Sequence, residues 1–278
     1  MQRTEQGNVF DRLIWKTDDC LLLDDLVFRI MHQNTGDWTG GEHFIFYKIQ
    51  PLIDQYAHYF RRRCDFQPKN IFELGIYDGG SIVFWHELFK PHKHVAVDLA
   101  DRIDGSYFQK YLMSRGLSDR IQTVWKTNQA DKSKLSHLIK TLFEAPPDLI
   151  IDDASHLYEP TLASFEALFP LMAPGGLYII EDWAWGHWRD FVAPREWAGK
   201  KPLTQLVTEL TESVGSWTNI ISDIAIYQGF IAVERGSRII DNPSSFRLEE
   251  HIYRRPSDQL LAHIPSYQRI VNYLKRKL

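Results

Sequence analysis

An apolar segment, DLIIDD (148–153), ends in two adjacent aspartates. Burying an unpaired carboxylate is unfavourable, so Asp152 and Asp153 either leave the core here or face something positive. His156 follows shortly afterwards. A histidine side chain has an ordinary pKa of about 6.5, which suits it to accept a proton at neutral pH. A lone histidine is most often structural, but beside these acids His156 is a candidate general base.

A second acidic pair, Glu181 and Asp182, ends the apolar segment GLYIIED (176–182). Neighbouring strands of a sheet lie about 4.8 Å apart, so acids at the ends of two adjacent parallel strands converge. Several carboxylates cannot share a small pocket while all are ionised unless a cation neutralises them. Oxygen ligands without cysteine favour Mg²⁺, Mn²⁺ or Ca²⁺ over zinc. The two acidic pairs therefore predict a divalent metal site.

Short apolar segments alternate with segments of helical length through the middle of the chain. The expected strands of this region are 70–75, 94–99, 121–125, 148–153 and 176–182. Such alternation predicts a parallel sheet covered by helices on both faces. Two further strands, 220–227 and 229–236, are almost continuous and must pair antiparallel. The predicted fold class is α/β: a doubly wound, Rossmann-like sheet of five parallel strands with a C-terminal antiparallel hairpin, as in methyltransferases that use S-adenosylmethionine.

Three parts of the chain follow from this pattern. We predict a helical N-terminal extension over 1–69, the sheet-containing core over 70–236, and a C-terminal tail over 237–278 with a helical end. Within the extension, 47–63 has the apolar face of a helix, and the glycine-rich stretch 33–43 reads as a loop. The extension is expected to contact substrate or another subunit, although simple packing is an equally good alternative.

The segment FELGIYDGGS (72–81) leads from an apolar strand through a glycine-rich turn into a helix. This layout lets backbone amides and a helix N-terminus approach a ligand closely. Its spacing is GxxxGG instead of the GxGxxG of dinucleotide sites, which disfavours a pyrophosphate ligand. The residues of this segment expected at the cofactor site are Glu73, Gly75, Tyr77, Asp78, Gly79 and Ser81.

Polar residues at the ends of the next strands complete an adenosyl site. Asp98 ends the second strand, where an acid can accept both ribose hydroxyls of an adenosine. Asn128 and Gln129 follow the third strand and could bind the adenine edge, while Asn128 or Asp131 could equally cap the next helix. Asp152 belongs to the acidic pair at the end of the fourth strand, 148–153, which lies at the switch point of the sheet where ligands bind, so we expect it to face the cofactor. We predict an adenosyl cofactor.

Composition excludes several classes of protein. The net charge of -4 and a pI near 6.3 argue against a broad nucleic-acid-binding surface. The two cysteines, Cys20 and Cys64, have no CxxC spacing, so neither a disulfide framework nor a thiolate metal site is indicated. No apolar stretch approaches the roughly 18 residues of a membrane span. We expect a cytoplasmic protein that binds neither nucleic acid nor membrane.

Taken together, the motifs FELGIYDGGS, TNQAD, LIIDDASH and FPLMAPGGLYIIEDW resemble the macrolide-sugar O-methyltransferases of the macrocin and mycinamicin type, a group related to the cephalosporin hydroxylase-like proteins. The resemblance covers about 70–236 and departs from the family at Asn128, where aspartate is common. It implies that Asp153, Glu181 and Asp182 ligate Mg²⁺ and that His156 is the general base on a sugar hydroxyl. It also implies homo-oligomers.

The loop after the fifth strand, WAWGHWRDFVAPREW (183–197), is richer in tryptophan than in that family. Its rings could cover the site and bind a sugar, or they could simply pack the loop or a subunit contact. We expect a Mg²⁺-dependent S-adenosylmethionine O-methyltransferase acting on a hydroxyl of a sugar or glycosylated natural product. The alternatives are a cephalosporin hydroxylase-like enzyme of other chemistry, an NAD-dependent oxidoreductase, and a non-catalytic scaffold, which would not need His156 beside the acids.

Overall fold

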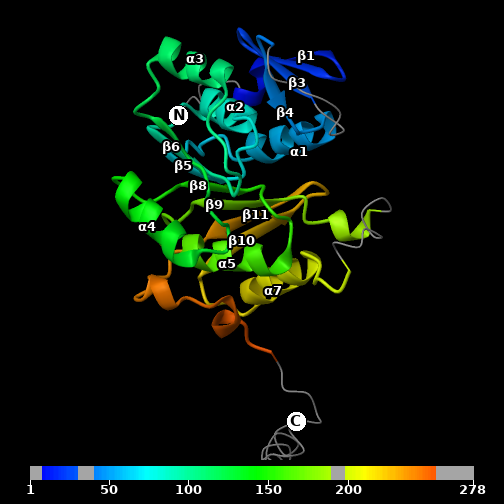
Figure 1. The fold of residues 1–278 in the computed structure, drawn as a ribbon. Coiled ribbons are helices and arrows are strands. Elements are labelled where there is room, and N and C mark those ends of the chain that lie inside the picture. The colour runs from blue at the N-terminus through cyan, green and yellow to red at the C-terminus, as the bar shows by residue number, and fades with distance from the viewer. Residues whose placement is uncertain (1–7, 31–40, 189–197, 255–278) are drawn as a thin grey trace, which may run out of the picture.

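A seven-stranded sheet forms the centre of the molecule in the computed structural model, which describes residues 8–30, 41–188 and 198–254 (Figure 1). Its strands are β5 (Asn70–Leu74), β6 (Lys93–Val97), β7 (Ile121–Val124), β8 (Leu149–Asp152), β9 (Leu177–Glu181), β10 (Ile221–Ile226) and β11 (Phe230–Arg235). They lie in the order β10-β11-β9-β8-β5-β6-β7. Strands β5 to β9 pair in parallel, and β11 pairs antiparallel with β9 and β10. The predicted fold class is confirmed.

Helices cover both faces of this sheet (Figure 1). The upper layer contains α1 (Gln50–Arg61), α2 (Gly80–Phe89) and α3 (Ser106–Arg115). The lower layer contains α4 (Lys132–Leu142), α5 (Tyr158–Leu168) and α7 (Thr204–Gly215). Because side chains of a strand alternate between the faces, Ile151 and Ile179 pack into the upper layer while Ile150 and Tyr178 pack into the lower one. Each layer therefore has its own apolar core.

The N-terminal extension contains more than the expected helix. The helix α1 lies within the predicted 47–63 and buries one apolar face. Four strands that we did not predict precede it: β1 (Leu13–Thr17), β2 (Cys20–Leu23), β3 (Leu26–Ile30) and β4 (Phe44–Phe46). They form a second sheet in the order β1-β2-β3-β4, with β3 and β4 parallel, after the short helix η1 (Val9–Arg12). The predicted helical extension is thus corrected to a small sheet followed by one helix.

The strands of this small sheet left a signal in the sequence. The stretch LIWKTDDCLLLDDLVFRI breaks its apolar residues with two Asp–Asp pairs, and these are the turns between β1, β2 and β3. Of the expected loop 33–43, residues 33–40 lie outside the described part of the chain. Residues 41–43 contain no helix or strand.

The C-terminal part ends, within the described residues, in short helical turns. These are η5 (Pro243–Ser245) and η6 (Leu248–His251), and two others lie earlier at η2 (Phe169–Leu171) and η3 (Trp185–His187). Phe246 and Leu248 are buried in the lower layer. The predicted helical end of the tail falls largely on 255–278, outside the described residues. In the described part of the chain, no helix combines the length and the apolar character that a membrane crossing requires.

Candidate active site

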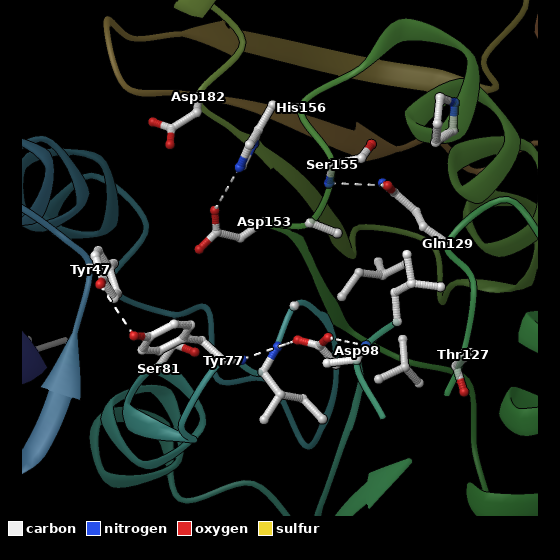
Figure 2. A pocket seen from close by; sticks show the side chains of 18 of the residues that line it. Tyr47, Tyr77, Ser81, Asp98, Thr127, Gln129, Asp153, Ser155, His156 and Asp182 are labelled. Atoms are coloured by element: carbon white, nitrogen blue, oxygen red, sulfur yellow. Dashed lines mark hydrogen bonds and ion pairs between the residues drawn. The ribbon is translucent and has the colours of Figure 1, made fainter. Parts of the chain in front are cut away.

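A cavity of about 940 Å³ lies at the carboxyl ends of β5, β6 and β8 (Figure 2). A space of this size accommodates a small-molecule ligand, and the position is where open α/β sheets bind their ligands. The predicted residues that line it are Gly75, Tyr77, Ser81, Asp98, Asn128, Gln129, Asp153, His156 and Asp182. The predicted residues outside its lining are Glu73, Asp78, Gly79, Asp152 and Glu181. The cavity thus brings together most of the residues singled out in the sequence.

The glycine-rich turn after β5 depends on Gly75. This glycine has a φ of +102°, and a Cβ atom placed on it would lie 2.2 Å from the backbone oxygen of Asp153. No other residue allows the turn to pass so close to the end of β8. Gly79, with a φ of +86°, then leads the chain into α2. The turn and the first acidic pair are therefore packed directly against each other.

Asp98 supports this turn from the end of β6. Its Oδ2 accepts hydrogen bonds from the backbone amides of Ile76 (2.8 Å) and Tyr77 (3.1 Å), and its Oδ1 accepts one from Ala100 (2.8 Å). We predicted that this carboxylate binds ribose hydroxyls. It lines the cavity, and Oδ1 has acceptor capacity beyond its one hydrogen bond, so contact with ribose stays a prediction beside the structural role.

Gln129 and Asn128 form hydrogen bonds with nearby residues of the fold. Gln129 is buried, its Nε2 donates to Asp152 (2.6 Å) and its Oε1 accepts from the backbone amide of Ser155 (3.2 Å). The amide therefore ties the loop after β8 to the lower layer, whereas we predicted contact with adenine. Asn128 accepts from the amide of Ala130, and Asp131 is the residue that caps α4.

In each of the two acidic pairs, the first acid points into a helical layer and the second lines the cavity. Asp152 and Glu181 are the last residues of β8 and β9, and strand alternation turns them to opposite faces of the sheet. Asp152 points into the lower layer, where it accepts hydrogen bonds from Ser164 (2.6 Å) and Tyr178 (2.8 Å) as well as from Gln129. Burial raises its pKa to about 6. We predicted that Asp152 faces the cofactor; its side chain instead points to the opposite side of the strand.

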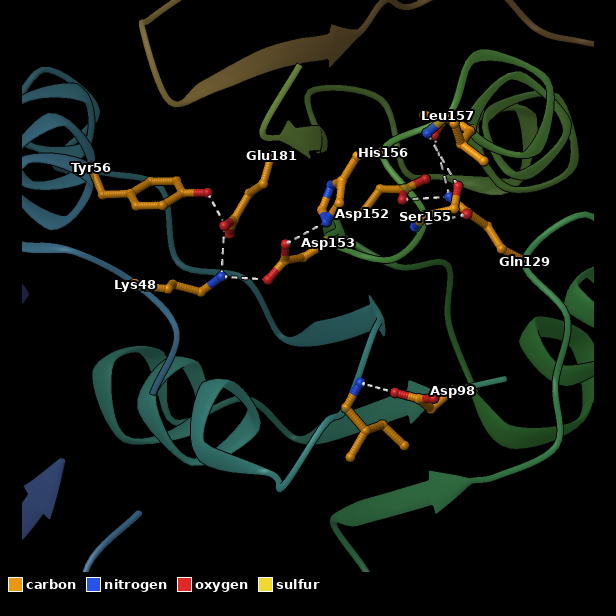
Figure 3. A network of polar contacts seen from close by, with 12 residues as sticks. Lys48, Tyr56, Asp98, Gln129, Asp152, Asp153, Ser155, His156, Leu157 and Glu181 are labelled. Carbon is orange, nitrogen blue, oxygen red and sulfur yellow. Dashed lines mark hydrogen bonds and ion pairs between the residues drawn. The ribbon is translucent and has the colours of Figure 1, made fainter. Parts of the chain in front are cut away.

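Glu181 points into the upper layer and contacts two residues of the N-terminal part (Figure 3). Its carboxylate accepts from the ammonium of Lys48 (2.6 Å) and from the hydroxyl of Tyr56 (2.8 Å). Burial and the nearby Asp153 raise the pKa of Glu181, while the hydrogen bonds from Lys48 and Tyr56 act to lower it. Both oxygens of Glu181 are thus engaged by these two donors. That Glu181 is a metal ligand stays a prediction.

The acids that follow the two strands do converge. Asp153, His156 and Asp182 each offer a ligand atom, and these atoms lie within 4.8 Å of one another at the wall of the cavity. His156 Nε2 lies 3.9 Å from Asp153 Oδ1. His156 and Asp182 both have positive φ values, 53° and 54°, and such strained backbone is concentrated at functional sites. Burial and the Asp153 carboxylate raise the pKa of Asp182 to about 7.

This group fits a divalent cation of the hard type. Two carboxylates at the edge of a cavity, with room for substrate and water, match the way Mg²⁺ is usually bound by one or two carboxylates. Burial and, after it, the nearby Asp153 carboxylate raise the pKa of Asp182, and a bound cation would favour its ionised form. Asp153 and Asp182 are therefore the residues that could hold such an ion, with His156 beside them.

Glu73 lies inside the sheet and not in the cavity. It is buried on β5 in the upper layer, with Oε2 at 3.2 Å from Nε2 of His94. Burial raises the pKa of Glu73 to about 8 and lowers that of His94 to about 3. Both groups are thus neutral near pH 7, which explains how the fold tolerates a glutamate there. We predicted a cofactor contact, and the side chain is instead an internal polar group.

The described part of the tryptophan-rich loop reaches the site through one ring. Trp185 packs against the imidazole of His156 with ring centroids 4.3 Å apart, and it lines the cavity. Trp183 turns away and donates to the backbone oxygen of Tyr227. Residues 189–197 of the loop lie outside the described residues. One ring of the loop therefore faces the cavity and another packs against the fold, and sugar binding by the loop stays a prediction.

Sequence reasoning missed Lys48. It is almost fully buried and bridges Asp153 and Glu181 from a position about 100 residues earlier in the chain. Burial alone would lower its pKa, but the two carboxylates outweigh this effect and raise it, so the side chain is charged. A lone lysine before a helix carries no motif. The only indication in the sequence was the excess of acids at the two strand ends, because buried carboxylates require a positively charged partner.

Comparison with known proteins finds similarity to methyltransferases. Residues 72–183 match the family described as a methyltransferase domain. The 8-demethyl-8-alpha-L-rhamnosyl tetracenomycin-C 2'-O-methyltransferase of Streptomyces olivaceus is 33% identical over 55% of this chain and 37% of its own length. Demethylmacrocin O-methyltransferase of Streptomyces fradiae is 32% identical over 69% of this chain and 44% of its own length. Mycinamicin VI 2''-O-methyltransferase of Micromonospora griseorubida is 30% identical, with coverages of 64% and 47%.

A solved structure shows the same relationship. The MycE methyltransferase from the mycinamycin biosynthetic pathway, in complex with Mg and SAH, superposes with a TM-score of 0.50 and 27% identity over 66% of this chain and 49% of MycE. The chain thus spans less than half the length of the relatives it matches. The predicted resemblance to the sugar O-methyltransferases is confirmed.

Proposed function

We propose that this chain, a member of the S-adenosylmethionine-dependent methyltransferases, is a Mg²⁺-dependent O-methyltransferase that acts on a hydroxyl of a sugar in a glycosylated small molecule. One observation carries the proposal. Asp153, His156 and Asp182 meet at the wall of the same cavity that the glycine-rich turn and Asp98 line. A methyl donor, a metal and an acceptor can therefore be held within reach of one base.

The residues of this wall divide the work of the reaction. When bound, S-adenosylmethionine supplies an electrophilic methyl group, and Mg²⁺ lowers the pKa of a hydroxyl that coordinates it. Asp153 and Asp182 would hold the ion, and a second, neighbouring hydroxyl of the acceptor would favour its chelation. His156 takes the proton of the acceptor hydroxyl at Nε2, the nitrogen that faces Asp153. Trp185 packs on the imidazole and so restricts its orientation.

A sugar acceptor is supported by chemistry and by the relatives. Trp185 presents an aromatic surface to the cavity next to His156, and flat rings suit the apolar faces of sugars. The names of the matched relatives describe O-methylation of rhamnosyl tetracenomycins and of mycinamicin VI. The family match also favours methyl transfer over the NAD-dependent oxidoreductase alternative. A homo-oligomer and a cytoplasmic location stay predictions, the first measurable by light scattering.

The test of the cofactor is calorimetric titration of S-adenosylmethionine and S-adenosylhomocysteine into the purified chain, with Mg²⁺ and with EDTA. We expect micromolar binding of both in either condition, because the cavity, the turn and Asp98 form the cofactor site without metal. Asp98→Ala should weaken binding by about tenfold or more, since it removes a charged acceptor and the support of the turn. Asp101→Ala is the matched control, because this exposed acid pairs with Lys126 outside the cavity lining.

The test of the metal uses Asp182→Asn. This variant should bind S-adenosylhomocysteine like the wild type, yet its methyl transfer to a panel of glycosylated acceptors should fall by about 100-fold and not return with excess Mg²⁺. Wild-type turnover that is indifferent to EDTA, or full activity of Asp182→Asn, would contradict the metal-dependent mechanism. Absence of cofactor binding in the wild type would contradict the proposed function as a whole.

A further inference from the structure

Lys48 introduces a positive charge into the acid cluster from outside the matched methyltransferase domain. Its side chain is 1% exposed, and Nζ lies 2.8 Å from Asp153 Oδ2 and 2.6 Å from Glu181 Oε2 (Figure 3). It belongs to the segment between β4 and α1 and lines the cavity. A buried charge with two carboxylate partners at these distances is a specific feature of the fold, because burying an ammonium without partners is strongly unfavourable.

The segment that carries Lys48 is seated firmly on the core. A Cβ atom on Gly80, at the start of α2, would lie 1.9 Å from the backbone oxygen of Ile45. Only a glycine lets β4 approach the helix so closely. Tyr56 on α1 adds a second contact by donating to Glu181. The ammonium is therefore held at the acids by backbone packing on one side and by α1 on the other.

The charge of the site then follows from its members. Asp153, Glu181 and Asp182 contribute three negative charges when ionised, and Lys48 contributes one positive charge. The remaining two negative charges are those that one divalent cation balances. We propose that Lys48 is a positioning residue that serves as the resident counter-ion of this cluster, and that it sets the affinity of the site for a divalent cation. This inference rests on the metal of the proposed function.

A geometric consequence accompanies the charge. Lys48 engages Oδ2 of Asp153, whereas Oδ1 lies on the side of His156. It also occupies Oε2 of Glu181, whose Oε1 is engaged by Tyr56. Asp153 is thus oriented with one oxygen for the metal and the base, and Glu181 acts through its charge. The affinity of the site for a divalent cation should then rise when Lys48 is neutralised and fall when Glu181 is neutralised.

The experiment is calorimetric titration of Mn²⁺ into the full chain at pH 7, in the absence of cofactor and acceptor. Lys48→Met should bind Mn²⁺ about tenfold or more tightly than the wild type, because a positive charge near the ion is gone. Glu181→Gln should bind it about tenfold or more weakly. The double variant Lys48→Met with Glu181→Gln restores the original net charge and should return to within a few-fold of the wild type.

The matched control is Lys132→Met. Lys132 also pairs with a buried carboxylate, that of Glu166, but lies in the lower layer away from the cavity. Its removal should leave Mn²⁺ affinity unchanged. Circular dichroism with thermal melting checks that each variant is folded. If Lys48→Met alone does not fold, the comparison of the double variant with Glu181→Gln still measures the contribution of Lys48, and the double variant should bind about tenfold more tightly.

Three results would overturn the inference, and they differ from one another. Equal Mn²⁺ affinity in the wild type and Lys48→Met would show that the lysine is only structural. A double variant as weak as Glu181→Gln would show that Glu181 is a direct ligand and that charge count does not govern the site. Absence of Mn²⁺ binding in the wild type would remove the metal from the proposed function and the role of Lys48 with it.

Discussion

The two acidic pairs look alike in sequence but are neutralised differently. In each pair the first acid ends a strand and is buried in a helical layer, and the second faces the cavity. Asp152 receives hydrogen bonds from neutral donors, all of them supplied by the core itself. Glu181 receives an ammonium and a phenol from the N-terminal extension. The acid of the lower face is therefore satisfied by the core alone, whereas the acid of the upper face requires residues of the extension.

This difference separates stability from chemistry along each strand end. The layer-facing acids have no access to the cavity, so their partners decide how well they are tolerated. The cavity-facing acids, Asp153 and Asp182, are close to His156, and each offers one oxygen atom on the side of the cavity. Changes to the cavity-facing groups should mainly lower turnover, whereas changes to the layer-facing acids should mainly lower stability, with Glu181 in addition contributing its charge to the metal site. Three predictions test the comparison from its largest effect to its smallest.

Removing a cavity-facing group should have the largest effect. His156→Ala is expected to lower turnover by about 1,000-fold, because general bases typically contribute 10²–10⁴-fold. The affinity for S-adenosylhomocysteine and the midpoint of thermal unfolding should stay nearly unchanged. His187→Ala is the matched control, since this histidine belongs to the same short helix η3 as the cavity-lining Trp185 but bonds Thr204 and does not itself line the cavity. Turnover retained in His156→Ala would remove the general-base assignment.

Removing the layer-facing acids should instead lower the free energy of unfolding, and by different amounts. Glu181→Ala leaves Lys48 buried with one carboxylate fewer, at a cost of about 3–4 kcal/mol. Asp152→Ala leaves neutral donors without an acceptor, at a cost of about 2 kcal/mol. Urea denaturation in EDTA measures both. A larger effect for Asp152→Ala would contradict the distinction between charged and neutral partners.

A buried histidine of the upper layer offers the smallest effect. Burial lowers the pKa of His86, on α2, to about 3. Below pH 6.5 the unfolded chain binds a proton that the folded chain does not, so this residue lowers stability as pH falls toward 3. Between pH 7 and pH 5 the free energy of unfolding of the wild type should fall by about 2 kcal/mol more than that of His86→Gln. Parallel pH dependences in urea denaturation would show that His86 is not buried as a neutral group.

The sequence by itself determined the fold class of this protein and the edge of the sheet at which its site lies. Continuous apolar strands alternating with helices leave a parallel sheet as the way to bury both faces, and the nearly continuous last two strands leave an antiparallel hairpin. Because parallel strands end at one edge, the acids after β8 and β9 and the turn after β5 had to meet there. His156, Asp153 and Asp182 could therefore be assigned to one site from residue types and spacing alone.

Tertiary structure decided which side chains actually enter that site. The alternation of a strand turned Asp152 and Glu181 out of the cavity, and this depends on the exact residue at which each strand ends. Gln129 donates to Asp152 because a buried carboxylate requires hydrogen-bond donors. Lys48 comes from the N-terminal extension, because packing of β4 on α2 places it beside the acids. Long-range contacts of this kind leave no local pattern in the chain, so only the folded protein shows them.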